Sequence, residues 1–262
     1  MTALTAAASP AAAGWRGTTT LQPGRLAFTG AAGSTGAHAH AAVQILLVSS
    51  GEVELSDTHR TRRTVRAAII PTLASHALHA GPDATATMIY LDPASTAARH
   101  LTTQLDGGSR DHVDGWIAAA RAALPPAALT EHAVDASALL CDGWAVPETR
   151  RHPVLQAAVD LVPQLLPGPV RLTELAATVR LSASRLGHLF TTELGLPFPA
   201  YLRWARLRHA AELAQHGASL THAAHGAGFT DSSHLTRVCR EMFGLAPSHL
   251  LHAIRPHAAG AA

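Results

Sequence analysis

The spacing of hydrophobic positions changes along the chain, and its first part reads as strands. Residues 24–92 contain short apolar runs bounded by Gly, Pro and Asp, namely VQILLV, EVEL, RAAII and TMIYL. Such runs with turn residues between them are typical of β-strands. Their regular spacing predicts a small barrel.

Residues 95–166 show apolar positions at helical spacing in short pieces, around Trp116, Leu124, Leu139 and Leu155. Prolines in LPP and LLPG interrupt the pieces, and proline ends or kinks a helix. This part of the chain is predicted to be a helical connector.

The last third contains an internal repeat with helical period. Each copy has a short apolar stripe with i, i+3, i+4, i+7 spacing, then a longer one, then a glycine suited to a helix C-cap. The matching positions are Leu172, Leu175, Ala176, Val179, Leu186, Leu189, Phe190 and Gly195, and then Leu220, Ala223, Ala224, Ala227, Leu235, Val238, Cys239 and Gly244. A short helix, a tight turn and a longer helix make a helix-turn-helix unit, so two such units are predicted.

A third helical stripe lies between the two copies, from Phe198 to His216, with Pro199 in a position that suits a first helical turn. At 1.5 Å per residue this helix is about 25 Å long. It can therefore separate the second helices of the two units by on the order of 34 Å, which is one turn of B-DNA.

Charge is distributed unevenly between the two parts. The chain has 262 residues and a net charge of +2, a length that suits one large or two ordinary domains. Residues 168–262 contain nine Arg and five acidic residues, whereas the preceding part has a small acidic excess. A basic C-terminal part favours a polyanionic partner.

Two cysteines without metal-like spacing favour a reducing compartment, and no apolar run reaches the length of a membrane span. We expect a cytoplasmic protein with no membrane partner.

Residues 170–251 resemble the DNA-binding domain of the AraC/XylS family of transcription regulators. The resemblance lies in LTELAATVRLSASRLGHLF, GLPFPAYLRWARLRHAAELA and GFTDSSHLTRVCREMFGLAPSHL. It implies a double-stranded DNA operator as partner, with the second helix of each unit in a major groove. The positions that it assigns to base contacts are Ser184, Arg185, His188, Ser232, Ser233, Thr236 and Arg237.

Helical spacing agrees with these positions in the second unit, because the apolar face leaves Arg237 and Arg240 pointing away from it. A guanidinium can donate two hydrogen bonds to guanine, so Arg237 is the best single candidate for reading a base. Arg240 and Arg203 are predicted to hold phosphates. The plain alternative is that Arg237 is an ordinary solvated charge.

The segment HAHAAVQILLVSSG resembles the first motif of a cupin, with His38, His40 and Gln44 on one face of a strand, and His76 resembles part of the second motif. Such histidines can converge on a divalent metal. Gln44 stands where the motif commonly has Glu. A pocket for a small organic effector, or a structural histidine cluster, stays an open alternative.

These observations predict an α+β protein with a cupin-like β-barrel, a helical connector and a C-terminal all-α domain of two helix-turn-helix units. The expected boundaries are a flexible N-terminal segment 1–20, an effector-sensing barrel 21–94, a connector and dimerisation region 95–167, a DNA-binding domain 168–254 and a flexible tail 255–262.

The predicted function is sequence-specific transcription regulation, modulated by a small molecule or metal in the barrel. Further expected partners are a second copy of the chain and, for an activator, RNA polymerase. The alternative is a metal-dependent cupin enzyme with a helical appendage. We predict no catalytic residue and no enzyme activity, because no Ser-His-Asp or paired-carboxylate pattern occurs.

Overall fold

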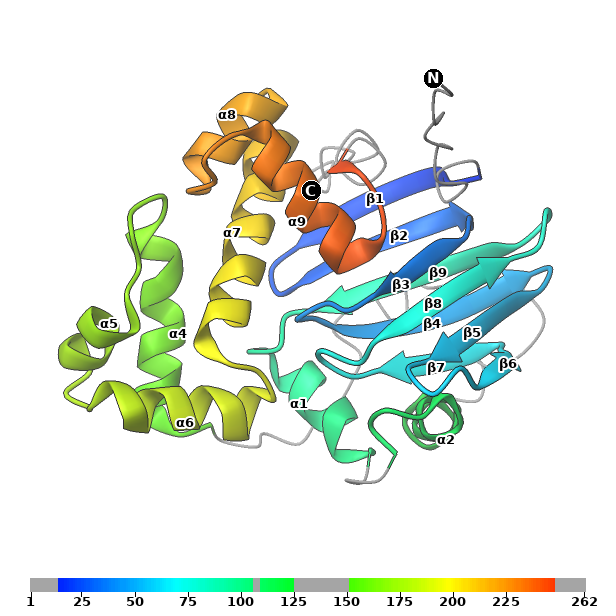
Figure 1. The fold of residues 1–262 in the computed structure, drawn as a ribbon, viewed down its shortest axis with the longest axis horizontal. Coiled ribbons are helices and arrows are strands. Elements are labelled where there is room, and N and C mark those ends of the chain that lie inside the picture. Colours follow the sequence, from blue (N-terminus) through cyan, green and yellow to red (C-terminus); the bar gives the residue numbers. More distant parts are fainter. Residues whose placement is uncertain (1–13, 106–108, 125–150, 248–262) are drawn as a thin grey trace, which may run out of the picture.

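The structure is a computed structural model, and it describes residues 14–105, 109–124 and 151–247. Figure 1 shows the strands gathered on one side of the molecule with α1 and α2 beneath them, and α4 to α8 on the other side, with α9 reaching across toward the sheets. The predicted α+β class, with strands before two helix-turn-helix units, is confirmed.

The N-terminal part contains two antiparallel sheets, which we call the strand domain. The first sheet has the order β1 (Arg16–Gln22), β2 (Arg25–Ala31), β9 (Thr85–Leu91), β4 (Val43–Ser50) and β7 (Ala67–Ile70). The second has the order β3 (Thr35–His38), β8 (His76–Ala80), β5 (Val53–Asp57) and β6 (Arg62–Thr64).

The apolar runs explain which strands are central. Every residue of β4 from Val43 to Val48 is buried, since β4 lies between β9 and β7 and is covered on both faces. In β5 buried and half-buried residues alternate, as expected for a strand that is covered on one face.

The sheets extend beyond the predicted barrel. The prediction of a flexible segment 1–20 is wrong for residues 16–20, because strand β1 begins at Arg16 and belongs to a sheet. Their pairing with β2 could not be predicted from the sequence, because RGTTT is polar and lacks the apolar run that is typical of a strand. Residues 1–13 and the predicted tail 255–262 lie outside the described residues.

Two helices of the predicted connector belong to the strand domain. Helix α1 (Thr96–Thr103) follows β9, and α2 (Val113–Ala123) packs against β7, with Trp116 fully buried. Figure 1 shows α2 beneath the sheets. The predicted connector is therefore divided between two domains, because the apolar faces of its helices pack against different elements. Residues 125–150 lie outside the described part.

The remaining helices form the helical domain, in which α4 packs against α5, α6 and α7. Its elements are α4 (Pro153–Leu165), α5 (Leu172–Thr178), α6 (Ala183–Leu194), α7 (Phe198–Gln215), α8 (Leu220–Gly226) and α9 (Ser232–Phe243). The pairs α5–α6 and α8–α9 are the two predicted helix-turn-helix units, and α7 joins them. None of the helices in the described ranges is both long and apolar enough to cross a membrane.

Candidate functional site

The second helices of the two units, α6 and α9, begin and end in the same way. The side chains of Ser182 and Asp231 accept hydrogen bonds from backbone N–H groups in the first turn. Gly195 and Gly244 end the helices with φ of 73° and 67°, a left-handed conformation that favours glycine. Both glycines stand where the repeat predicted a C-cap.

Helix α6 separates its apolar and polar residues cleanly. Leu186 and Phe190 are fully buried, while the three candidate base-contacting residues Ser184, Arg185 and His188 are exposed. The first predicted reading surface is therefore accessible to a partner.

Helix α9 presents a similar polar face. Ser233, Arg237 and Arg240 are exposed, and together with the half-buried Thr236 and the exposed Glu241 they line one shallow hollow. The fourth candidate, Ser232, is half-buried at the start of the helix, where its carbonyl accepts a hydrogen bond from the Thr236 hydroxyl.

The arginines of these faces differ in their partners. Arg203 on α7 lies 3.7 Å from the Glu241 carboxylate, and both side chains are about half exposed. Among the residues that the structure describes, no carboxylate forms an ion pair with Arg185, Arg237 or Arg240. Three guanidinium groups can therefore meet an external anion without first breaking an internal ion pair.

The strand domain brings the predicted histidines together, but not on one strand as predicted, because His38 ends β3, His40 lies between the strands and Gln44 lies on β4. One ring nitrogen from each of His38, His40 and His76 lies within 4.8 Å of the other two, and all three residues are buried. Burial lowers the pKa of His38 to about 4 and also lowers the pKa of His40 and His76. Gln44 joins the cluster, since its Oε1 is 2.8 Å from His40 Nε2.

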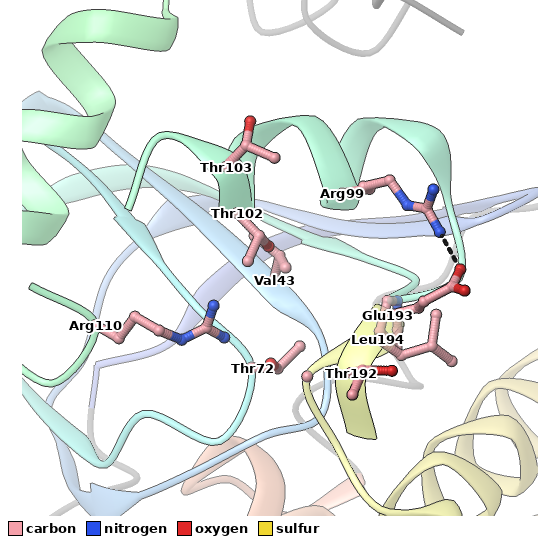
Figure 2. Close-up of a pocket in the computed structure, with 11 residues that line it drawn as sticks. Val43, Thr72, Arg99, Thr102, Thr103, Arg110, Thr192, Glu193 and Leu194 are labelled. Atoms are coloured by element: carbon pink, nitrogen blue, oxygen red, sulfur yellow. Dashed lines mark hydrogen bonds and ion pairs between the residues drawn. The ribbon is translucent and has the colours of Figure 1, made fainter. Parts of the chain in front are cut away.

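A pocket of about 420 Å³ lies where α6 meets the strand domain. Figure 2 shows Arg110 extending toward Thr72 from one side and Arg99 paired with Glu193 on the other. The Arg110 guanidinium has no ion-pair partner among the described residues, and the buried Thr72 Oγ1 lacks a hydrogen-bond partner there. The pocket thus combines an available cation with an unsatisfied hydroxyl.

The C-cap glycines of both second helices lie against the strand domain. A Cβ atom on Gly195 would be 2.9 Å from Thr72 Oγ1, and one on Gly244 would be 2.8 Å from Thr35 Cβ. Gly195 therefore touches the pocket, and Gly244 lies beside the strand that carries His38. The end of α6 therefore contacts the pocket, and the end of α9 contacts the strand that carries His38.

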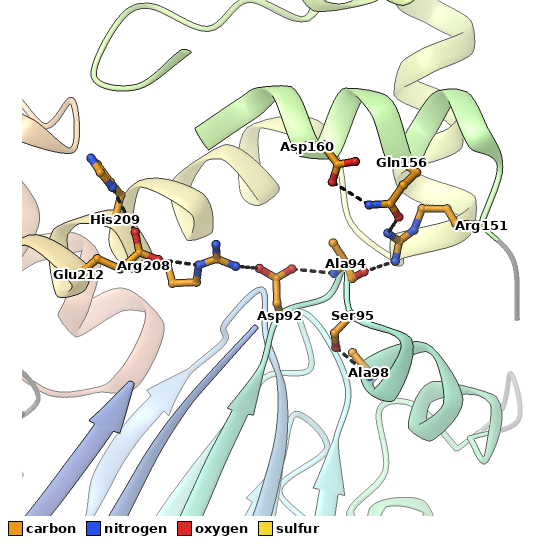
Figure 3. A network of polar contacts seen from close by, with 10 residues as sticks. All are labelled: Asp92, Ala94, Ser95, Ala98, Arg151, Gln156, Asp160, Arg208, His209 and Glu212. Atoms are coloured by element: carbon orange, nitrogen blue, oxygen red, sulfur yellow. Dashed lines mark hydrogen bonds and ion pairs between the residues drawn. The ribbon is translucent and has the colours of Figure 1, made fainter. Parts of the chain in front are cut away.

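Polar contacts also cross between the domains. Asp92, directly after β9, pairs with Arg208 of α7, and Arg99 of α1 pairs with Glu193 of α6 at 2.7 Å. Figure 3 shows Asp92 at the centre of a network that continues through Ala94 to Arg151. These contacts hold the helical domain on the strand domain.

The pocket could not be predicted from the sequence. Arg110 and Thr72 lie in loops, carry no motif and are distant along the chain, so only folding places them together. The exposed positions on the second helices could be predicted, because a repeat, a helical period and the family resemblance mark them.

Residues 175–253 match the family model of a helix-turn-helix domain, of the AraC type. No relative among curated proteins matches the sequence.

Among solved structures, the chain is similar to ToxT from Vibrio cholerae O395. The identity is 13%, the TM-score is 0.55, and the match covers 88% of this chain and 98% of that one. A second ToxT structure, bound to (E)-4-(8-methylnaphthalen-1-yl)but-3-enoic acid, matches with 14% identity and a TM-score of 0.51 over 84% of this chain and 95% of that one. At such identities the likeness shows a shared fold.

The helix-turn-helix match, the two exposed second helices and the shared two-domain fold agree with one another. The C-terminal part of the chain contains an AraC-type helix-turn-helix domain of a DNA-binding transcription regulator, and a strand domain precedes it.

Proposed function

We propose that the chain binds a double-stranded operator with α6 and α9 in two successive major grooves. The observation that carries this proposal is the equivalence of the two helices, which share caps, buried faces and exposed polar faces. Helix α7 joins the two units, and Figure 1 shows α5–α6 at one of its ends and α8 at the other. Such a spacer separates two reading surfaces on one side of DNA.

The proposed base-reading residues form two groups, one on each second helix. They are Ser184, Arg185 and His188 on α6, and Ser232, Ser233, Thr236 and Arg237 on α9. Arg240 and Arg203 hold phosphates, which fix the register without reading sequence. For Arg203, a phosphate replaces the solvent-exposed Glu241 carboxylate as partner.

We further propose that the effector is a small organic acid in the pocket beside α6. Arg110 offers a guanidinium that can bind a carboxylate through two hydrogen bonds, and the Thr72 hydroxyl offers another polar contact. The ToxT structure with a bound enoic acid supports this ligand class. Because Gly195 borders the pocket, the ligand would contact the end of a DNA-reading helix.

The remaining expectations complete this proposal. The protein acts in the cytoplasm as a homodimer, contacts RNA polymerase if it activates transcription, and has no enzymatic activity. A regulator needs binding free energy that differs between two states of the protein, and it needs no turnover.

The operator proposal is tested by selecting DNA fragments with the full chain and measuring their affinities at several salt concentrations. We expect one preferred site with two half-sites, and an affinity that falls steeply as salt rises. Arg185→Ala and Arg237→Ala should each relax one half-site, while Arg62→Ala, an exposed arginine on β6, should change neither. An equal loss of affinity for all DNA sequences would mean that both residues contact phosphates and do not read bases.

The effector proposal is tested separately, without DNA, by thermal shift against a panel of aliphatic and aromatic carboxylic acids. Stabilisation of the unmodified chain that is lost in Arg110→Gln and kept in Arg121→Ala supports it, since Arg121 is exposed on α2 away from the pocket lining. If stabilisation is equal in both variants, the acid binds elsewhere.

A further inference from the structure

The three buried histidines of the strand domain are all held through the same ring nitrogen. Nδ1 of His38, His40 and His76 lies 2.8–2.9 Å from the backbone carbonyl of Gly36, Ala42 and Ala74, respectively. Each carbonyl accepts a hydrogen bond from Nδ1–H, so in the neutral ring the lone pair is on Nε2. A ring fixed in this way by a backbone carbonyl is the usual arrangement of a histidine that ligates a metal.

The three rings lie close together in a buried space. The ring centroids of His38 and His76 are 4.2 Å apart, and those of His40 and His76 are 5.1 Å apart. His76 Nε2 is buried and has no hydrogen-bond partner among the described residues. A buried polar atom without a partner destabilises the fold, and a bound ligand would remove that cost.

His40 meets two oxygen atoms and can donate to only one of them while it is neutral. Its Nδ1 faces the Ala42 carbonyl, and its Nε2 is 2.8 Å from Gln44 Oε1. Rotating the Gln44 amide by 180° would satisfy His40 but would leave His76 Nε2 without a partner. A cation between these atoms satisfies all of them.

We propose that His38, His40 and His76 bind a divalent transition metal through Nε2, with the Gln44 side-chain oxygen as an adjacent ligand. Three imidazole nitrogens favour Zn²⁺, Ni²⁺, Cu²⁺ or Fe²⁺, whereas Mg²⁺ and Ca²⁺ prefer oxygen ligands. Zinc binds imidazole nitrogens at about 2.0–2.1 Å, a distance that small ring movements within the cluster can reach.

The metal site is closed by the end of helix α9. The Phe243 ring lies 4.8 Å from the Tyr90 ring and 6.4 Å from the His40 ring, measured between centroids. A Cβ atom on Gly244 would be 3.5 Å from His38 Nδ1. An ion beneath these residues would therefore touch the strand domain and lie under the helix that carries Arg237. Metal binding would in this way affect the position of the DNA-binding face. This last step rests on the proposed function.

The metal proposal is tested on the full chain after removal of metal by a chelator. Zn²⁺ is titrated by calorimetry, and Co²⁺ by its visible absorption, which reports nitrogen coordination. We expect about one ion per chain and displacement of Co²⁺ by Zn²⁺. His76→Ala should weaken binding by about 100-fold or more, because loss of outer contacts alone already costs 10–100-fold. His79→Ala is the matched control, since His79 is exposed on the same strand.

A second variant guards against loss of folding in His76→Ala. Gln44→Glu should bind Zn²⁺ more tightly than the unmodified chain and show a larger rise in melting temperature with the ion, because a carboxylate is a stronger ligand than an amide. The proposal is wrong if Co²⁺ gives no visible bands with the unmodified chain, or if His76→Ala and His79→Ala bind equally. No DNA is present, so this result does not depend on operator binding.

Discussion

At the scale of single residues, Asp57 shows how one side chain can join two elements. Its Oδ1 accepts hydrogen bonds from the backbone N–H groups of His59 at 2.9 Å and Thr61 at 3.0 Å, and its Oδ2 accepts one from Val113 at 3.1 Å. The carboxylate thus shapes the turn after β5 and fastens the start of α2. Burial raises the pKa of Asp57, but the three N–H donors outweigh burial and the pKa is lowered overall.

Asp57→Ala is expected to lower the free energy of unfolding by about 2–3 kcal/mol, since buried backbone donors lose their acceptor. Because the carboxylate has a lowered pKa in the folded protein, its contribution is present above the unfolded pKa of 3.8 and is lost as pH falls through the folded value. Urea unfolding from pH 7 to pH 3 measures this, with the exposed Asp83→Ala as control. A constant difference over that range would contradict the role of the charge.

Arg237 and Arg240 are neighbours on α9 with different predicted roles. Arg237→Ala should cost about 1–3 kcal/mol on the preferred operator and relax the preference at one base pair. Arg240→Ala should weaken binding to all sequences alike and reduce the salt dependence. Affinities on an operator and on single-base variants distinguish the two, and a uniform loss in Arg237→Ala would make it a phosphate contact.

At the scale of elements, the two helix-turn-helix units are anchored at matching points. Each second helix ends in a left-handed glycine, and each glycine lies against the strand domain, Gly195 at Thr72 and Gly244 at Thr35. The glycines therefore serve two purposes, as C-caps and as positions of close approach. A side chain at either position would separate the domains or strain the cap.

Gly244→Ala is compared with Gly217→Ala to separate these two effects. Both residues have positive φ, which costs a non-glycine residue about 1–2 kcal/mol. Only Gly244 has neighbours that a Cβ would meet, and nothing lies within 4 Å of a Cβ on Gly217. We expect similar backbone costs and a further loss for Gly244→Ala in thermal unfolding, with faster hydrogen exchange at β3. Equal losses would mean that the contact with Thr35 adjusts freely.

At the scale of the whole molecule, half-buried ion pairs connect the two domains. The Arg99 and Glu193 side chains are 17% and 23% exposed, and Glu193 also accepts a hydrogen bond from the His152 backbone N–H. Arg208 and Asp92 form the second pair, with Asp92 only 7% exposed. Both bridges must open if the helical domain is to move relative to the strand domain.

A double-mutant cycle on Arg99→Ala and Glu193→Ala measures the first bridge. We expect a coupling of about 1–3 kcal/mol in the free energy of unfolding, since the pair is shielded from solvent. The exposed pair of Arg62 and Glu54 is the control, with an expected coupling below about 1 kcal/mol. Similar coupling energies for both pairs would show that the Arg99–Glu193 ion pair does not stabilise the contact between the domains.

The sequence by itself determined the features that depend on local pattern. The spacing of hydrophobic residues predicted the strands, and the internal repeat predicted both helix-turn-helix units. The apolar stripe on α9 distinguished its buried residues from Arg237. These signals are strong because a helix or strand repeats its contacts at a fixed interval along the chain.

Tertiary structure decided what depends on contacts between distant residues. The polar strand β1 belongs to the sheet because it pairs with β2. Helix α2 belongs to the strand domain because Trp116 is buried there. Arg110 and Thr72 line the same pocket at the end of α6. Tertiary structure also placed the predicted histidines His38, His40 and His76 beneath Phe243. No spacing rule encodes these contacts, because the residues come together only when complementary apolar surfaces are buried.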